Sequence, residues 1–228
     1  MNKGQEKGTE NVTVILPYAS DEEYYVEDLG TVVDKPLYAF LKRTFDVLFA
    51  LVLMILLAVP MLIIAVIVKI SSGGKVLYYQ ARLGRNGKPM NIIKFRTMRE
   101  DAEADGVRWS AGDADPRITP VGRILRKTHL DELPQLWCIL VGDMSVVGPR
   151  PERPEYYDRF EQYIHGFRER LKVKPGLTGL AQVKGGYYLK PEEKIMYDVQ
   201  YIKTRSIGLD LRIVLETVKV VFCCEGVK

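Results

Sequence analysis

The chain has 228 residues, 47% of them hydrophobic and 27% charged, and this composition excludes both a disordered protein and a multi-span transporter. Its three cysteines form no C-x-x-C pair and it has only two histidines, so neither a cysteine zinc site nor a histidine metal cage is expected. Residues 1–41 contain three lysines and eight acidic residues, whereas residues 42–228 contain thirty basic and twenty-one acidic residues. The basic part suits an anionic partner, which is nucleic acid, a phosphorylated small molecule or an anionic membrane surface.

Residues 1–41 form an acidic lead-in. Its first ten residues are polar, lack hydrophobic periodicity and are expected to be disordered. Residues 12–16 predict one short strand, which Pro17 ends. No signal peptide is expected, because the first long apolar run starts late and follows an acidic segment.

An uncharged run of 22 residues, 47–68, follows and is interrupted only by Pro60. As one helix it would extend about 33 Å, which is enough to cross the hydrocarbon core of a bilayer. Soluble helices of this length normally keep a polar face, so the sequence predicts membrane association.

Both flanks of this run are basic, with Lys42 and Arg43 before it and Lys69 and Lys75 after it. Because positive flanks favour the cytoplasmic side, both ends are expected there. Pro60 supplies the break, since a proline inside a helix removes a hydrogen bond and clashes with the preceding turn. The sequence predicts a re-entrant membrane hairpin over residues 42–75, with a proline-kinked transmembrane helix as the alternative.

A β-hairpin is expected next. Residues 76–80 and 91–96 have strand-like composition, and Asn86-Gly87 between them is the preferred pair for a two-residue hairpin turn. Alternation places Lys94 and Arg96 on one side of the return strand. These side chains and Arg82 are candidates for binding the phosphate groups of a ligand, or equally of lipid headgroups.

The main candidate site lies within residues 111–151. Thr119 and Pro120 are the natural cap and first residue of a helix, and Asp131-Glu132 follow it between apolar residues. A capping box starting at Thr128 would give these acids a purely structural role, but Pro134 would then fall in the second turn. We therefore expect Asp131 to cap the helix, with its carboxylate at the positive helix end, where phosphate groups are also stabilised.

Arg150 lies between two prolines that restrict its position, as suits a guanidinium that grips phosphate, although a rigid structural turn is the alternative. Residues 152–172 predict a charged helix whose aromatic stripe is typical of core or membrane-surface packing. Another helix is expected from Pro191, and the apolar residues 214–222 suit the core or the membrane interface.

A series of short motifs extends from about residue 42 to residue 222. In order they are Lys42-Arg43-x-x-Asp46, Pro60, Gln80-x-Arg82-x-Gly84, Lys94-Phe95-Arg96-Thr97-Met98, Asp115-Pro116-Arg117, Asp131-Glu132-Leu133-Pro134-Gln135, Gly142-Asp143-Met144-Ser145, Gly148-Pro149-Arg150-Pro151, Lys174-Pro175-Gly176-Leu177-Thr178-Gly179 and Tyr201-Ile202 with Asp210. Together they resemble the bacterial sugar transferase family, the monotopic phosphoglycosyl transferases that act as polyprenyl-phosphate sugar-1-phosphate transferases.

The resemblance implies an Mg²⁺-dependent enzyme that moves a sugar-1-phosphate from a UDP-sugar to undecaprenyl phosphate and so starts a glycan. Asp131 would be the nucleophile that forms a phosphosugar-enzyme intermediate, Glu132 would complete the dyad, and both would be metal ligands. The implied place is the cytoplasmic face of the bacterial inner membrane, with the hairpin turning at Pro60. The implied partners are membrane lipids and no nucleic acid, with a homodimer as one option.

The residues expected to bind substrate are carried over position by position: Arg82, Lys94, Arg96, Arg117, Arg126, Arg150 and Asp198. Two departures from the family pattern stand near these positions. His129 replaces a small hydroxyl residue beside the dyad, and Gly185-Gly186-Tyr187 replaces Gly-Arg-Asn in a region near the sugar.

The expected fold class is α+β and mainly helical. The re-entrant hairpin would join a compact cytosolic catalytic domain, residues 76–228, that contains the β-hairpin and interfacial helices. The rival hypothesis is a non-catalytic, membrane-anchored module whose basic face binds anionic lipid or nucleotide.

Overall fold

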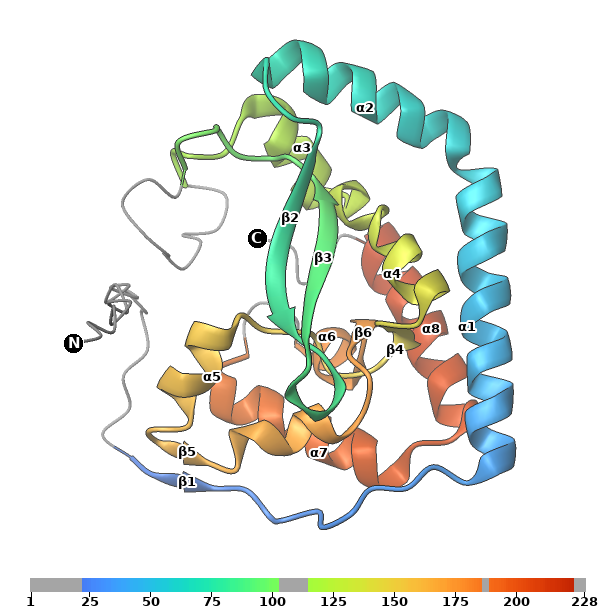
Figure 1. Ribbon diagram of the computed structural model, residues 1–228, viewed down its shortest axis with the longest axis vertical. Helices are drawn as coiled ribbons and strands as arrows, with labels where there is room; N and C mark the ends of the chain where they lie inside the picture. Colours follow the sequence, from blue (N-terminus) through green and yellow to red (C-terminus); the bar gives the residue numbers. More distant parts are fainter. Residues whose placement is uncertain (1–21, 103–114, 186–188, 224–228) are drawn as a thin grey trace, which may run out of the picture.

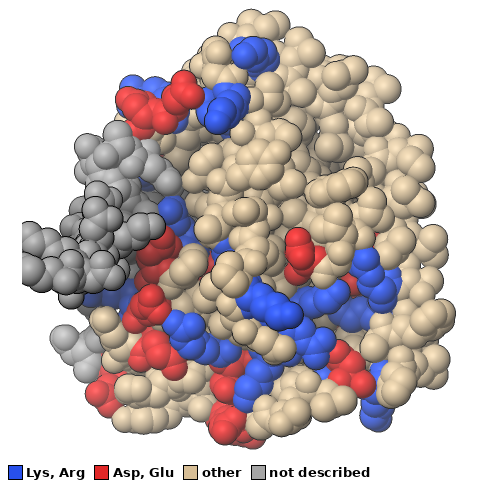
Figure 2. Space-filling model, in the orientation of Figure 1, with Lys and Arg blue, Asp and Glu red and all other residues tan. Residues whose placement is uncertain are grey.

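Two long apolar helices frame the computed structural model, which describes residues 22–102, 115–185 and 189–223 (Figure 1). Helix α1 spans Pro36–Leu56 and α2 spans Ala58–Ser72, and the pair is bent by 64°. No single helix in the described ranges is long and apolar enough to cross a membrane, whereas this bent pair meets the same criterion together. In the same orientation, the edge of the molecule at which α1 meets α2 shows no charged side chain (Figure 2).

The bend lies at Leu57, just before Pro60, which occupies the first turn of α2. Proline has no N–H, so the carbonyl of Leu56 loses its helical donor, and the proline ring also clashes with that carbonyl. Pro60 therefore accounts for the bend, but the chain turns on the N-terminal side of the proline rather than at the proline itself.

The expected β-hairpin is present. Strand β2, Leu77–Leu83, pairs antiparallel with β3, Pro89–Phe95. The predicted two-residue turn is wrong, because residues 84–88 form a wider loop that contains the 3-10 turn Arg85–Gly87. Asn86 and Gly87 both have positive φ angles of 58° and 72°, so this residue pair still provides the left-handed backbone of the loop.

The largest hydrophobic cluster lies where α1 packs against α4, Gln135–Val141. Beside it, β4, Ser145–Val147, pairs in parallel with β6, Gly176–Thr178. Three helices follow β6, and α7 begins at the predicted proline. They are α6, Leu180–Lys184, α7, Pro191–Thr204, and α8, Ile207–Cys223. The expected mainly helical α+β class is thus confirmed for the described residues, with small two-stranded sheets.

The predicted helix over residues 152–172 is wrong. Helix α5, Pro154–Phe160, is followed by β5, Ile164–His165, and by the 3-10 segment η4, Phe167–Lys172. Gly166 has a φ of 93°, which a continuous helix does not allow, and it separates β5 from η4. The aromatic side chains of this region form a second buried cluster, so core packing is the one of the two expected roles that the structure shows.

Part of the acidic lead-in packs against the domain as a strap, which we define as residues 22–35. Strand β1, Tyr24–Tyr25, pairs in parallel with β5. Asp28 lies 2.9 Å from Lys172, Asp34 lies 2.7 Å from Arg205, and Glu27 pairs with Lys203. The strand expected at residues 12–16 and the polar first ten residues lie outside the described ranges.

Asp46 joins α1 to β4. Its Oδ1 accepts hydrogen bonds from Ser145 Oγ at 3.0 Å and from the Val146 backbone N at 2.8 Å, and its side chain is buried. One turn earlier, Arg43 donates to the carbonyls of Ile139 and Leu140 at 2.7 Å each, which satisfies the C-terminal end of α4. These residues of the first sequence motif therefore attach the apolar helix to the core.

We predict that Asp46→Ala lowers the free energy of unfolding by about 2 kcal/mol, because it leaves the buried Val146 N–H without an acceptor. Asp46→Asn keeps a carbonyl oxygen at that position and should cost clearly less. Urea unfolding in detergent micelles, followed by tryptophan fluorescence, measures both variants. Equal losses for the two would contradict this account of the joint.

Candidate functional site

The two adjacent acids lie in a 3-10 turn, Leu130–Glu132, between α3, Pro120–Lys127, and α4. Thr119 caps α3 as predicted, with its Oγ1 accepting from Gly122 N at 2.9 Å. The predicted cap at Asp131 is wrong. Pro134 stands at the cap position of α4, so the helix begins at Gln135 and Asp131 remains in the preceding 3-10 turn.

The capping-box alternative is wrong as well, because Thr128 ends α3 and its hydroxyl donates to the Ile124 carbonyl at 2.9 Å. His129 then reverses the chain with a φ of 57°, a left-handed conformation that is uncommon for a residue with a side chain. This reversal turns the next residues back toward β3, where Asp131 and Glu132 are buried.

Glu132 is held by two cations. Lys94 on β3 donates to its Oε1 at 2.5 Å, and Arg150 donates to Oε2 from Nη1 at 3.2 Å and to Oε1 from Nη2. Burial raises the pKa of the Glu132 carboxyl, but Arg150 and Lys94 lower it more, so the pKa lies well below its usual range. Glu132 is therefore ionised at neutral pH.

Asp131 differs sharply from its neighbour. Within the described part of the chain, its carboxylate receives no hydrogen bond, although its residue is only 5% exposed. Burial raises the pKa of the Asp131 carboxyl to about 6, with Lys94 opposing this shift and the Glu132 charge adding to it. Two neighbouring carboxyls with separated pKa values are typical of catalytic pairs, in which each group has its own role.

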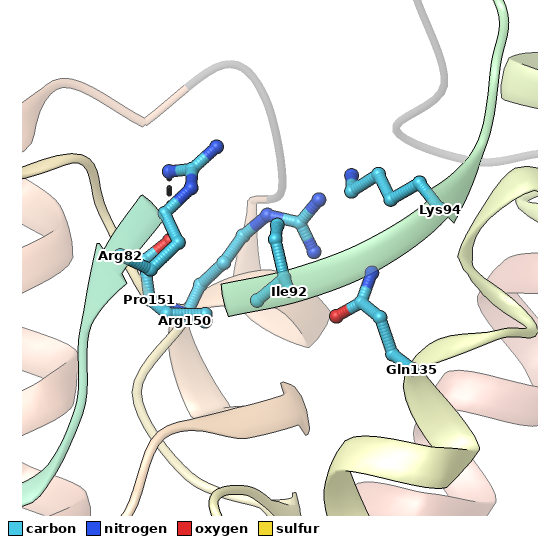
Figure 3. A pocket seen from close by; sticks show the side chains of 6 residues that line it. All are labelled: Arg82, Ile92, Lys94, Gln135, Arg150 and Pro151. Carbon is cyan, nitrogen blue, oxygen red and sulfur yellow. Dashed lines mark hydrogen bonds between the residues drawn. The ribbon is translucent and has the colours of Figure 1, made fainter. Parts of the chain in front are cut away.

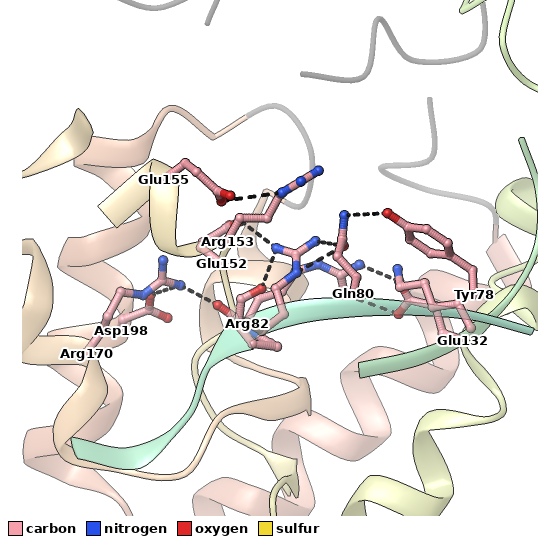
Figure 4. A network of polar contacts seen from close by, with 12 residues as sticks. Tyr78, Gln80, Arg82, Glu132, Glu152, Arg153, Glu155, Arg170 and Asp198 are labelled. Carbon is pink, nitrogen blue, oxygen red and sulfur yellow. Dashed lines mark hydrogen bonds and ion pairs between the residues drawn. The ribbon is translucent and has the colours of Figure 1, made fainter. Parts of the chain in front are cut away.

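A second buried ion pair fixes the backbone of Arg150. Arg170 donates to the Arg150 carbonyl at 2.9 Å and pairs with Asp198 at 2.7 Å, and both side chains of this pair are at most 2% exposed. Pro149 and Pro151 restrict the backbone on either side. This chain of polar contacts from Asp198 toward Glu132 is drawn in Figure 4.

Arg82 on β2 completes the basic side of the site. Its Nη1 donates to the Pro151 carbonyl at 2.9 Å and lies 3.3 Å from Glu152 Oε2, and its Nε donates to Gln80 Oε1 at 3.1 Å. A narrow pocket lies between these groups (Figure 3). Its lining residues are Arg82, Ile92, Lys94, Gln135, Arg150 and Pro151. Three cations around one pocket make it suited to a phosphate group.

The structure brings five of the predicted site residues together: Arg82, Lys94, Asp131, Glu132 and Arg150. Arg126 lies near them, since its charge lowers the pKa of Asp131, while its Nε donates to Thr97 Oγ1 at 2.9 Å.

Three other predicted site residues bind partners outside this group of five. Arg96 faces Glu100 at 3.6 Å, and Arg117 binds Asp115 through Nε and Nη2 at 2.9 and 2.6 Å. Asp198 is buried and pairs with Arg170, which in turn donates to the Arg150 carbonyl. For this residue the structure suggests support of the site rather than contact with a ligand.

Sequence reasoning missed Arg170, Glu152 and Gln135 as members of the site. The first two lie in the stretch predicted as one charged helix, and the tertiary fold buries both of them. Gln135 follows the acidic pair within one motif, so its proximity in sequence was the one available signal.

Few of the described side chains are available to bind a metal ion at this site. Among the described residues, no group of three or more His, Cys, Asp and Glu side chains is placed to hold a metal. Asp131 has both carboxylate oxygens available, whereas Glu132 already binds Lys94 and Arg150. Mg²⁺ commonly binds through one or two carboxylates together with substrate phosphates and water, so the site fits an Mg²⁺ that binds with a phosphorylated ligand.

We predict that Glu132→Gln lowers the pKa of Asp131 below 6, because it removes a neighbouring negative charge and leaves Lys94 and Arg150 to act on Asp131. In the unaltered protein Asp131 takes up its proton as the pH falls through about 6, and in the variant it should stay ionised to lower pH. Carbon-13 NMR of the aspartate carboxyls in metal-free protein measures this. Glu100→Gln, at an exposed site, is the matched control, and an unchanged or higher pKa in Glu132→Gln would contradict the prediction.

We also predict that Asp198→Ala lowers the free energy of unfolding by about 3 to 5 kcal/mol, because the buried Arg170 guanidinium loses the carboxylate that it pairs with. The double change Arg170→Met with Asp198→Leu should recover much of that loss, since it buries apolar groups instead. Thermal unfolding of the three proteins measures this. A double variant as unstable as the single one would show that the buried charge is not the cause.

The sequence matches the family described as bacterial sugar transferase over residues 37–224. It is 38% identical over 210 residues to the UDP-N-acetylgalactosamine-undecaprenyl-phosphate N-acetylgalactosaminephosphotransferase of Aeromonas hydrophila, covering 91% of this chain and 49% of that protein. It is 40% identical over 206 residues to the UDP-glucose:undecaprenyl-phosphate glucose-1-phosphate transferase of Escherichia coli K12, covering 85% and 44%.

A third relative is similar over almost its whole length. The exopolysaccharide production protein ExoY of Rhizobium meliloti is 39% identical over 222 residues, covering 91% of this chain and 96% of ExoY. By contrast, the chain spans about half the length of the two transferases above.

Proposed function

The chain belongs to the bacterial sugar transferase family, and on this premise we propose that it transfers a sugar-1-phosphate from a UDP-sugar to undecaprenyl phosphate. The products are UMP and a polyprenyl-diphosphate-sugar, the first intermediate of an exopolysaccharide or another cell-surface glycan. The observation that carries the proposal is Asp131, a buried carboxylate without a hydrogen-bond donor in the described structure, beside a glutamate that two cations hold.

We propose Asp131 as the nucleophile. A carboxylate oxygen attacks the phosphorus that carries the sugar, the bond to the UMP oxygen breaks, and the phosphosugar stays on Asp131 as an acyl phosphate. A phosphate oxygen of undecaprenyl phosphate then attacks the same phosphorus and releases Asp131. Asp131 suits this role because no hydrogen bond from the described residues holds its lone pairs.

Glu132 positions the cations rather than reacting. It fixes Lys94 and Arg150 at one edge of the pocket, and these cations with Arg82 balance the charge of the phosphate groups during transfer. Asp131 would hold an Mg²⁺ ion, whose chemistry there is to neutralise the charge of the phosphate groups. Glu132, the second expected ligand, would have to release Lys94 or Arg150 to bind it. Arg170 keeps the Arg150 backbone in place.

The bent helix pair supports a place at the membrane. Many apolar side chains of α1 and α2 are exposed, for example Ile55 at 68% and Leu62 at 66%, and a bilayer would cover them. On α4, which follows the acidic pair, Trp137 is 50% exposed, as suits an aromatic side chain at a membrane interface. The lipid acceptor would then meet the site from the cytoplasmic leaflet.

We predict that the purified chain, given Mg²⁺, undecaprenyl phosphate and a panel of UDP-sugars, releases UMP with at least one of the sugars. A luminescent UMP assay with a parallel lipid extraction measures both products. Release that depends on undecaprenyl phosphate supports transfer. The absence of UMP with every sugar would favour the rival hypothesis, a membrane-anchored module that only binds anionic lipid or nucleotide.

In the same assay, Asp131→Asn should abolish turnover and also the phosphosugar adduct seen by intact mass spectrometry without the lipid acceptor. The amide lacks the charge and the nucleophilic oxygen pair of the carboxylate. Asp158→Asn, at an exposed ion pair, is the matched control and should keep both signals. An adduct that persists in Asp131→Asn would rule out this residue as the nucleophile.

A further inference from the structure

Gln135, the first residue of α4, has a buried side-chain amide whose nitrogen is unsatisfied in the described part of the chain. The residue is 2% exposed, and its Nε2 has no hydrogen-bond partner among the described residues. A buried donor without an acceptor is unfavourable and is rare in folded proteins, so it calls for an explanation. Its location supplies one, because Gln135 lines the basic pocket of the site.

The amide is surrounded by donors. Figure 3 shows its nitrogen directed toward the space between the ends of Arg150 and Lys94. Arginine and lysine side chains have no acceptor atoms, so neither can satisfy the Gln135 amide. What this part of the pocket lacks is an acceptor, and an anionic oxygen would contact Gln135 and the cations at once.

The other lining donors are already engaged. Lys94 and Arg150 bind Glu132, and Arg82 binds Gln80, a carbonyl and Glu152. Among the described polar side chains around the pocket, Gln135 is therefore the one whose donor has no partner. A bound ligand could accept a hydrogen bond from it without breaking an existing one. The cavity volume of about 10 Å³ has room for roughly one oxygen atom, which matches one oxygen of a larger phosphate group.

We propose that Gln135 is a catalytic residue, whose Nε2–H donates a hydrogen bond to a non-bridging oxygen of the phosphoryl group that Asp131 accepts and passes on. This inference rests on the proposed function. A neutral donor stabilises the charge that develops on this oxygen and does not compete with Lys94 or Arg150 for Glu132. Because the phosphoryl group stays in place when UMP leaves, Gln135 serves both transfer steps.

The first test replaces Gln135 by methionine, which has a similar length and no donor. Removal of one preorganised donor to a developing oxyanion typically costs about a hundredfold or more in rate. We expect Gln135→Met to slow both adduct formation from an active UDP-sugar and adduct discharge to undecaprenyl phosphate by about that factor, with little change in KM. Gln200→Met, on the exposed side of α7, should leave both rates unchanged.

Two results of this test would overturn the inference. One is a Gln135→Met enzyme that keeps both rates within about twofold of the unaltered enzyme, since a lost transition-state hydrogen bond should cost far more. The other is a higher KM with an unchanged kcat, which would mean that Gln135 only helps to bind the donor substrate. Thermal unfolding of the variant separates loss of fold from loss of rate.

A second measurement does not need turnover. In protein labelled with nitrogen-15 at glutamine side chains, titration with inorganic phosphate should shift one amide signal, and this signal should be missing in Gln135→Met. Its failure to shift, in protein that binds phosphate by calorimetry, would overturn the inference even if transfer is observed. Conversely, an inactive chain whose Gln135 amide still responds to phosphate would refute the proposed transfer and leave the phosphate contact standing.

Discussion

The site depends on one interaction, the double ion pair that Glu132 makes with Lys94 and Arg150. Three separate parts of the chain meet in it: the return strand of the hairpin, the turn after α3 and the proline-flanked loop after β4. Two cations near a buried acid offset the cost of its burial and keep it ionised. The same pairing leaves Asp131 beside it, desolvated and free of hydrogen bonds within the described residues, which is the state in which a carboxylate is most reactive.

Other buried polar contacts hold the members of this ion pair in place. Behind Arg150 lies the Arg170–Asp198 pair, and Asp46 fastens α1 to the strand that leads to Arg150. The apolar frame and the charged site are therefore coupled through a short rigid path rather than through a flexible linker. With α1 and α2 held in a bilayer, as we propose, this coupling would set the position of Asp131 relative to the lipids.

Local signals predicted the elements that depend on local physics, such as the β-hairpin, the Thr119 cap and the start of α7. They failed at Asp131, where a 3-10 turn and a left-handed His129 replace the expected cap, because tertiary packing of the acids onto β3 outweighs helix propensity. They failed again around Gly166, whose positive φ divides a stretch with the charge pattern of one helix. The sequence motifs contain most of the acidic and basic residues that meet at the site. The Arg170–Asp198 pair, in contrast, joins residues far apart in the sequence, so the spacing of residues along the chain does not predict it.

The strap and the Asp46 joint respond differently to ionic strength. Side chains in the strap's ion pairs are partly to largely exposed, up to 85% for Asp28, so these pairs contribute little to stability and weaken further as the salt concentration rises. Asp46 is buried at 2% exposure and salt does not reach its hydrogen bonds. A rise in ionic strength is therefore expected to weaken the attachment of the strap, while the hydrogen bonds of Asp46 to Ser145 and Val146 hold.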